Sequence, residues 1–172
     1  MNSKLKIWFF CFLAIAFIGC DRVTKDIARE HLKDKPSISY FNDKLRFVYA
    51  ENTGAFLSFG ANWSNAKSFW LLTVLPILFL SGFLFIVMRK AHKLSPLEMT
   101  AFILILSGGI GNLIDRMLFD RHVADFINVG IGNVRTGIFN VADLYVTTGF
   151  ILLLINYLRK PSAKKQPQSK TD

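Results

Sequence analysis

The apolar stretch that most strongly determines the fold lies at residues 139–158 and reads FNVADLYVTTGFILLLINYL. About 20 apolar residues in an α-helix cross a hydrocarbon core of about 30 Å. The one acidic residue of this stretch, Asp143, falls in what would be the first helical turn. A carboxylate costs about 2.5–3.5 kcal/mol at the centre of a spanning helix, so an acid at a membrane boundary is a functional hypothesis by default.

Three other apolar runs precede it, at about residues 7–20, 69–88 and 99–117. Hydrophobic residues make up 52% of the 172 residues. The mean hydropathy of +0.35 is high for a soluble protein and ordinary for a small integral membrane protein. The first run is short, but a helix could continue past it through Asp21–Glu30. We therefore predict an all-α polytopic membrane protein with four transmembrane helices.

The first run admits a second interpretation. Two lysines, an apolar stretch and then Phe17-Ile18-Gly19-Cys20 are similar to a lipoprotein signal peptide with its lipobox. Phe17 fits poorly where such a box has Leu, Val or Ile. Three more spans also follow, where a soluble domain would be normal. We expect a retained span.

Basic residues gather on one side of the predicted spans. The two termini and the 89–98 connection carry Lys4, Lys6, Arg89, Lys90, Lys93, Arg159, Lys160, Lys164, Lys165 and Lys170, against Glu98 and Asp172. The positive-inside tendency places both termini and this connection in the cytoplasm, and segments 21–68 and 118–138 outside. Because the net charge of +9 serves as this topology signal, no nucleic-acid partner is expected.

The outer segment 38–60 alternates in the manner of strands. Apolar residues at 38, 40, 45, 47 and 49 alternate with polar ones on either side of Asn42-Asp43, a turn dipeptide. This pattern predicts a small extracytoplasmic β-cradle between spans one and two, lying on the membrane surface. Residues 1–160 then form a single membrane-embedded domain, and the polar tail 161–172 is expected to be disordered.

The unusual polar residues of the spans fall at one depth, the outer leaflet. They are Asp21 and Lys25 at the end of span one, Asn112, Asp115 and Arg116 at the end of span three with Gly108 on the same stripe, and Asn140 and Asp143 at the start of span four; Asp125 lies in the outer loop between the last two. The span midplanes are almost free of charge. A transporter site at the midplane or a polar channel is therefore excluded, and the pattern predicts a site open to the outer membrane face.

Structural roles stay open for several of these residues. Asp21 and Lys25, at i and i+4, are equally explained as an interfacial ion pair. Glycines at 108, 109 and 111 are often needed only for close helix packing. Asp115 and Arg116 could be a pair that orients the end of the span.

Two other functions compete with catalysis by paired acids. A small carrier or lipid-binding scaffold would place Asp125 and Asp143 in structural ion pairs with Arg116 or Arg121. A lipid-modifying transferase would favour a His or Cys nucleophile or a metal motif, and none is arranged here.

Five motifs now stand in order along four predicted spans: DRVTK at 21–25, NTGAF at 52–56, GGIGNLIDR at 108–116, VADF at 123–126 and FNVAD at 139–143. In these motifs the chain closely resembles the bacterial lipoprotein signal peptidases (signal peptidase II), over roughly residues 5–160. Ala124 stands where the family usually has Val, a neutral change that leaves the adjacent aspartate in place.

The resemblance implies a membrane aspartic endopeptidase with Asp125 and Asp143 as its catalytic pair, without metal or cofactor. The implied substrate is a prolipoprotein whose lipobox Cys carries a diacylglyceryl group, cut just before that Cys at the outer face of the cytoplasmic membrane. Positions that surround the site in the family match Asp21, Lys25, Asn52, Gly54, Gly108, Asn112, Arg116, Asn140 and Ala142. Globomycin and myxovirescin inhibit the family. Membrane lipids are further expected partners, and we expect a monomer.

Paired carboxylates suit peptide hydrolysis without a metal. One carboxylate activates water and the other carboxyl protonates the leaving amine. Both states coexist because mutual repulsion keeps one of them protonated while the other ionises. Such a pair titrates as a unit, so the sequence does not assign the acid and the base. We also expect Asp21 and Lys25 to fix the cradle to the spans, and the loop Asn128–Gly137 to be a mobile lid.

Overall fold

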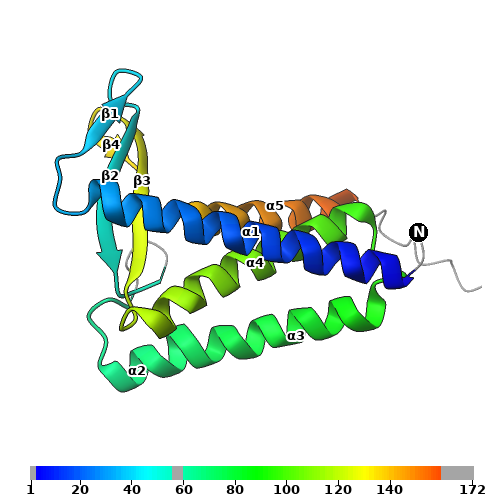
Figure 1. The fold of residues 1–172 in the computed structure, drawn as a ribbon. Helices are drawn as coiled ribbons and strands as arrows, with labels where there is room; N and C mark the ends of the chain where they lie inside the picture. Colours follow the sequence, from blue (N-terminus) through cyan, green and yellow to red (C-terminus); the bar gives the residue numbers. More distant parts are fainter. Residues whose placement is uncertain (1–2, 56–59, 160–172) are drawn as a thin grey trace, which may run out of the picture.

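The computed structural model describes residues 3–55 and 60–159 of the chain. In this part of the chain four long helical segments lie side by side, and a small sheet lies across one end of them (Figure 1). Each segment is long and apolar enough to cross a membrane, which confirms the predicted fold class. The expected disordered tail 161–172 lies outside the described residues, as do residues 56–59 of the predicted cradle.

The spans begin and end close to the predicted limits, except the first. Helix α1 runs over Ser3–Leu32, so it does continue past its apolar run through Asp21–Glu30. The second span comprises α2 (Asn65–Phe69), a π-helical turn η2 (Trp70–Val74) and α3 (Leu75–Lys90). Helix α4 covers Pro96–Leu118 and α5 covers Val141–Arg159. The start of α1 and the end of α5 lie at the end opposite the sheet (Figure 1).

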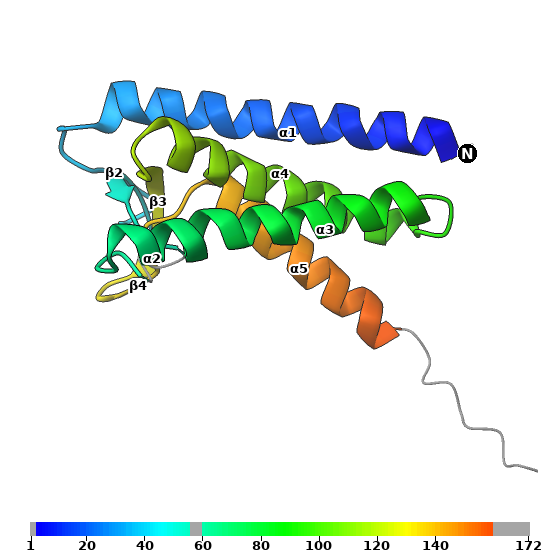
Figure 2. The same cartoon turned by 90° about the horizontal axis from the view of Figure 1, so that it is seen from below.

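Helix α4 is the centre of the bundle and packs against α1, α3 and α5 (Figure 2). Most of its residues from Met99 to Gly108 are buried, and they form the apolar core with side chains from α1 and α3 such as Phe10 and Leu80. The outward faces of the other spans keep large apolar side chains exposed, as expected of helices that face lipid.

Small residues let α4 and α5 approach each other closely. A side chain at Gly149 of α5 would meet Ile105 Cγ1 at 2.6 Å and the Ala101 carbonyl oxygen at 2.8 Å. A side chain at Gly108 of α4 would collide with the carbonyl oxygen of Ala142. The predicted packing role of Gly108 therefore has a definite partner, the first turn of α5 just before Asp143.

The sheet has four antiparallel strands in the order β1-β2-β3-β4. Strands β1 (Ile38–Tyr40) and β2 (Leu45–Asn52) form the predicted hairpin about Asn42-Asp43. Strands β3 (Val123–Ile131) and β4 (Val134–Arg135) come from the connection between α4 and α5. The cradle is thus built from two outer connections that lie about 80 residues apart in sequence.

This arrangement corrects the expectation for Asp125 and gives the structure of the expected lid, whose mobility stays a prediction. Asp125 was expected in a loop, but it lies within strand β3, paired with Ala50 of β2. The expected lid Asn128–Gly137 is mostly the β3–β4 hairpin, in which Gly130 pairs with Arg135 and Ile131 with Val134. The signal for β3 was present, because apolar residues at 123, 127, 129 and 131 share one face of a strand. Asp125 on that same face hid the alternation.

The contact between α4 and α5 yields a stability prediction. Gly149→Leu forces Ile105 or the α4 backbone to move and should cost about 1–3 kcal/mol, measured as a lower thermal unfolding midpoint in detergent. Gly82→Leu is the matched control, because nothing lies within 4 Å of a Cβ at that position of α3. Equal midpoints for the two variants would contradict the close packing of α4 on α5.

Candidate active site

The two candidate aspartates line one cavity at the end of the bundle that the sheet covers. Asp125 reaches it from β3 and Asp143 from the first turn of α5. The cavity has a volume of about 570 Å³. Asn52, Asn112 and Arg116 also line its polar end. Its apolar part lies between α3, α4 and α5 and is lined by Leu72, Pro76, Gly109, Leu113, Val146 and Phe150, among others.

Asp143 is fixed by the start of its own helix. Its backbone N–H donates to Asn140 Oδ1 at 3.0 Å, and the Asn140 N–H donates back to Asp143 Oδ2 at 3.1 Å. This is a reciprocal capping arrangement with Asn and Asp in the roles that Ser or Thr and Glu usually fill. The other carboxylate oxygen, Oδ1, accepts a hydrogen bond from Asn112 Nδ2 at 2.8 Å.

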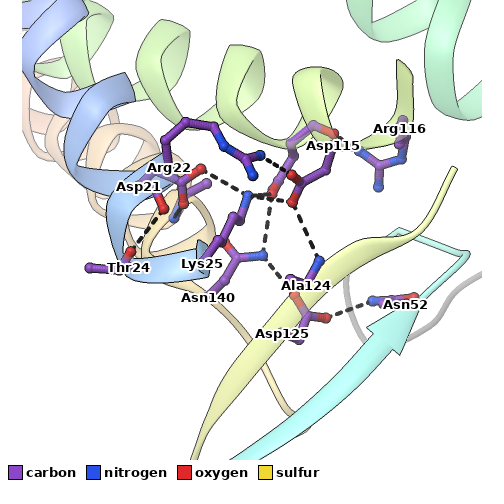
Figure 3. Close-up of polar contacts among 12 residues, drawn as sticks. Asp21, Arg22, Thr24, Lys25, Asn52, Asp115, Arg116, Ala124, Asp125 and Asn140 are labelled. Atoms are coloured by element: carbon purple, nitrogen blue, oxygen red, sulfur yellow. Dashed lines mark hydrogen bonds and ion pairs between the residues drawn. The ribbon is translucent and has the colours of Figure 1, made fainter. Parts of the chain in front are cut away.

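Asp125 is held by two asparagines from different elements. Asn140 Nδ2 donates to its Oδ1 at 2.6 Å, and Asn52 Nδ2 donates to its Oδ2 at 3.0 Å (Figure 3 shows the second bond). Asn140 therefore links the two aspartates, since its backbone N–H and its Oδ1 bind Asp143 and its Nδ2 binds Asp125.

An irregularity in strand β2 selects Asn52 for this contact. Phe47 pairs with Ile127, whereas Ala50 pairs with Asp125, so β2 carries one extra residue between these pairs. Asn52 is consequently opposite Val123, on the same face as Asp125. With regular pairing that position would belong to Glu51, because a shift of one residue exchanges the two faces of a strand. The bulge supplies an amide donor where a third carboxylate would otherwise lie.

The environment of Asp125 favours its protonated form. Its residue is only 2% exposed. Burial raises the pKa of its carboxyl from the ordinary value of 3.8 to about 6, and the negative charge of Asp143 adds to the rise. Hydrogen bonds from Asn52 and Asn140 lower the pKa and offset only part of this effect.

Arginine side chains near the cavity bind other groups. Arg116 Nη2 donates to the Gly54 carbonyl at 2.8 Å, and Arg121 Nη2 donates to Asn65 Oδ1 at 2.8 Å. Within residues 3–55 and 60–159, neither Asp125 nor Asp143 forms an ion pair. The ion pairs that a purely structural role would require are therefore not formed in the described part of the chain.

Behind the aspartates lies a buried ion cluster, formed by Asp21, Arg22 and Lys25 of α1 and Asp115 of α4 (Figure 3). Lys25 Nζ lies 2.8 Å from Asp21 Oδ2 and 3.0 Å from Asp115 Oδ2, and all three side chains are fully buried. Arg22 pairs with the other oxygen of Asp115. Two acids and two bases compensate one another, as buried charges must.

The cluster also positions the backbone next to each aspartate. Asp21 Oδ1 accepts a hydrogen bond from the Ala142 N–H at 2.9 Å, and Asp115 Oδ2 accepts one from the Ala124 N–H at 3.3 Å. Ala142 precedes Asp143, and Ala124 precedes Asp125. Asp21 and Lys25 thus tie α1 to α4 and α5, and they reach the sheet through Asp115.

Sequence reasoning placed most of these residues but missed several partners. Asp115 pairs with Lys25 and Arg22 instead of Arg116, and Arg22 was not singled out at all. The Arg22–Asp115 contact joins residues 93 positions apart, so no local pattern announces it. Gly54 has two contacts, since its N–H binds Asn52 Oδ1 and its carbonyl binds Arg116. Phe56 of the same motif lies outside the described residues.

Four helices long enough to span a membrane, with two carboxylates in one cavity at their sheet-covered end, define a polytopic membrane protein with a paired-carboxylate site. The family model described as signal peptidase (SPase) II matches residues 13–159. The lipoprotein signal peptidase of Chlorobaculum tepidum is 39% identical over 155 residues, which cover 85% of this chain and 91% of that protein. The lipoprotein signal peptidase of Borreliella burgdorferi is 33% identical, in an alignment that covers 90% of this chain and 93% of that protein.

Solved structures agree with these relatives. A bacterial membrane enzyme determined by the in meso method at 2.3 Å resolution has a TM-score of 0.77 at 30% identity, with 95% of this chain and 96% of that chain covered. A second, at 1.9 Å resolution, has a TM-score of 0.73 at 28% identity. The chain belongs to the signal peptidase II family.

The raised pKa of Asp125 predicts how stability depends on pH. A carboxyl that binds its proton more tightly when folded stabilises the fold below the unfolded pKa of about 4, and this contribution is lost as the pH rises through about 6. The loss should be on the order of 3 kcal/mol. Wild-type protein in detergent should therefore unfold at a lower temperature at pH 7.5 than at pH 4.5.

The Asp125→Asn variant isolates this contribution. Its unfolding midpoint should change clearly less between the two pH values, whatever its absolute stability. Asp120→Asn is the control, because Asp120 is exposed and its positive φ of 46° is a conformation that asparagine tolerates. If Asp125→Asn retains the wild-type pH dependence, the raised pKa is wrong.

Proposed function

We propose that Asp125 and Asp143 are the catalytic pair of an endopeptidase that removes the signal peptide from diacylglyceryl-modified prolipoproteins. One observation carries the proposal. The two carboxylates share a cavity, every one of their four oxygens accepts a hydrogen bond from a neutral amide N–H, and neither is ion-paired within the described residues. Neutral donors fix a carboxylate without removing its ability to exchange a proton.

The two aspartates take different parts in the reaction. Asp143 lies at the N-terminus of α5, where the helix dipole favours a negative charge, so it is the base. Asp125, whose burial raises the pKa of its carboxyl to about 6, is the acid. This assignment separates two chemically identical groups by their environments.

The proposed reaction has two steps and consumes one water. In the first, Asp143 accepts a proton from water as the water oxygen attacks the carbonyl carbon, and Asp125 gives its proton to the carbonyl oxygen. In the second, the C–N bond breaks as Asp143 passes the proton to the leaving nitrogen. Asp125 recovers its proton from the hydroxyl that becomes the new carboxylic acid, and both residues return to their starting states.

Arg116 is suited to hold the substrate backbone. Its Nη2 is used by the Gly54 carbonyl, but its buried Nε has no hydrogen-bond partner within the described residues. A buried donor without a partner costs free energy, and a substrate carbonyl entering the cavity would satisfy it. Asn112 and Asn52 are occupied with the aspartates, so their support is to the catalytic groups.

The apolar part of the cavity accounts for recognition of a lipid-modified signal helix. Val146, Phe150 and Ile151 of α5 and Leu72 and Pro76 of the second span line it. A signal helix or acyl chain that lies against them gains about 0.8 kcal/mol per buried CH₂. The diacylglyceryl group of the precursor therefore adds affinity that an unmodified precursor lacks.

We place the site at the outer leaflet of the bacterial cytoplasmic membrane. The end of the bundle away from the sheet carries Lys4, Lys6, Arg89, Lys90, Lys93 and Arg159, against Glu98 among the described residues. By the positive-inside tendency that end, with both termini, is cytoplasmic. The enzyme acts as a monomer, and globomycin-type peptides compete for the same cavity.

Substitution of either aspartate tests the catalytic assignment. Asp125→Asn and Asp143→Asn should each lower cleavage of a purified diacylglyceryl-modified prolipoprotein by about 10³-fold or more, because each removes a proton donor or acceptor. A gel-shift assay in detergent measures this. Asp120→Asn should cleave at the wild-type rate. Normal cleavage by either dyad variant would reject this pair, and no cleavage by folded wild type would reject the peptidase.

Cysteine labelling tests the orientation. In a variant with Cys11 and Cys20 replaced by Ala, we expect a membrane-impermeant maleimide added to spheroplasts to label Lys35→Cys, which lies beyond α1 at the sheet end. His92→Cys, between α3 and α4, should react only after the membrane is opened. Both positions are exposed, so the reverse pattern would mean that the protein is inserted the other way round.

A further inference from the structure

Asn112 is the residue through which the ion cluster reaches the catalytic pair. Its Nδ2 donates to Asp143 Oδ1 at 2.8 Å, and its Oδ1 accepts from Lys25 Nζ at 2.9 Å. A side-chain amide has nearly the same shape in its two flipped orientations, so its hydrogen-bond partners decide which one it adopts. Only one orientation helps Asp143, because the flipped amide would turn an oxygen toward the carboxylate.

Lys25 is the partner that settles this choice. An ammonium group has three donors and no acceptor, and three oxygens surround Lys25 Nζ, from Asp21, Asp115 and Asn112, at 2.8, 3.0 and 2.9 Å. The flipped amide would place an NH₂ group against the ammonium. Asn140 Nδ2 also donates to Asn112 Oδ1, at 3.2 Å, but it makes its shorter bond to Asp125 at 2.6 Å.

We propose that Lys25 is a positioning residue for catalysis, which orients the Asn112 amide so that its N–H group holds Asp143. This proposal rests on the proposed function and goes beyond it. Lys25 touches neither aspartate of the pair in the contacts described above. Lys25 acts on Asp143 through the Asn112 side chain, which lies between them. This positioning effect is distinct from the stability that the ion cluster gives to the bundle.

The charged groups that face this chain of contacts come from every element packed around it. They are Asp21 and Arg22 of α1, Asp115 and Arg116 of α4, Asp125 of β3 and Asp143 of α5. Asp21, Arg22 and Asp115 form one neutral group with Lys25. Loss of Lys25 alone would leave a net negative charge beside the dyad, so the test needs a variant in which charge is conserved.

The double variant Lys25→Met, Asp21→Asn conserves the net charge of this group. Asn at position 21 keeps an oxygen for the Ala142 N–H, and Arg22 still balances Asp115. Relative both to wild type, which has the same net charge, and to Asp21→Asn alone, the double variant should show kcat about 10²-fold lower, as expected for loss of one oriented donor, with KM changed less than threefold. Its acid limb of activity should move to higher pH, because Asp143 loses a hydrogen bond to its charged form.

A double-mutant cycle separates positioning from structure. In an Asn112→Ala background the same Lys25→Met change should lower kcat less than threefold, since the amide is already gone. An equally large loss in both backgrounds would overturn the proposal. So would a double variant with the kcat and pH profile of Asp21→Asn. Lys33→Met, a change of the same kind in a lysine that pairs with exposed Glu51, should leave kcat and the pH profile unchanged.

Asn112→Asp keeps the proposal testable if Lys25→Met does not fold. This variant gives Lys25 a stronger partner but turns an acceptor toward Asp143, so it should fold, cleave at least about 10²-fold more slowly and shift the acid limb to higher pH. A wild-type pH profile would overturn the proposal. Because wild type and Asp21→Asn must cleave in the same assay, failure of the proposed function is recognised separately, by loss of cleavage in both.

Discussion

One buried ammonium group organises the sheet-covered end of this protein. Lys25 pairs with Asp21 and Asp115, and each of these two acids also accepts a backbone hydrogen bond, Asp21 from the Ala142 N–H and Asp115 from the Ala124 N–H. Both alanines stand in the same local sequence, Val-Ala-Asp, and in both the next residue is a proposed catalytic aspartate. A buried ion pair is expensive and often adds little net stability. Here the ions fix two backbone segments of different secondary structure, one in a strand and the other at the start of a helix.

The aspartates themselves are surrounded by asparagines. A cation in contact with Asp125 or Asp143 would hold that carboxylate ionised and remove the difference in proton affinity that acid–base catalysis needs. The amides of Asn52, Asn112 and Asn140 hold the oxygens in place without adding charge. Arg116 lines the same cavity, yet the Gly54 carbonyl accepts one of its N–H groups. Among the described contacts Lys25 is linked to Asp143 through Asn112 and forms no ion pair with either aspartate of the pair, so it can fix the geometry of the pair without a direct ion pair.

Much of this could be predicted from sequence, because spans and their polar ends are local patterns. Four apolar runs defined the four spans, and the shared depth of Asp21, Asn112, Asn140 and Asp143 predicted that they meet. Strand β3 was missed, because Asp125 interrupts the alternation of apolar residues that would otherwise have indicated a strand. The Arg22–Asp115 pair and the identity of the Lys25 partners depend on how α1 crosses α4. Such contacts between distant residues leave no trace in the spacing of either segment.

The sheet explains why a membrane enzyme of this kind needs more than helices. At the membrane surface an irregular loop would leave backbone groups to compete with water and would hold Asp125 loosely, whereas strand pairing fixes the backbone of β3 on both sides of it. Pairing alone would still present the wrong neighbour, because regular register places Glu51 beside Asp125. A third carboxylate there would raise the proton affinity of the pair until neither acid ionised readily near neutral pH. The one-residue bulge in β2 replaces that acid with the Asn52 amide, so a local irregularity in the sheet suits the proposed catalytic pair to acid–base chemistry.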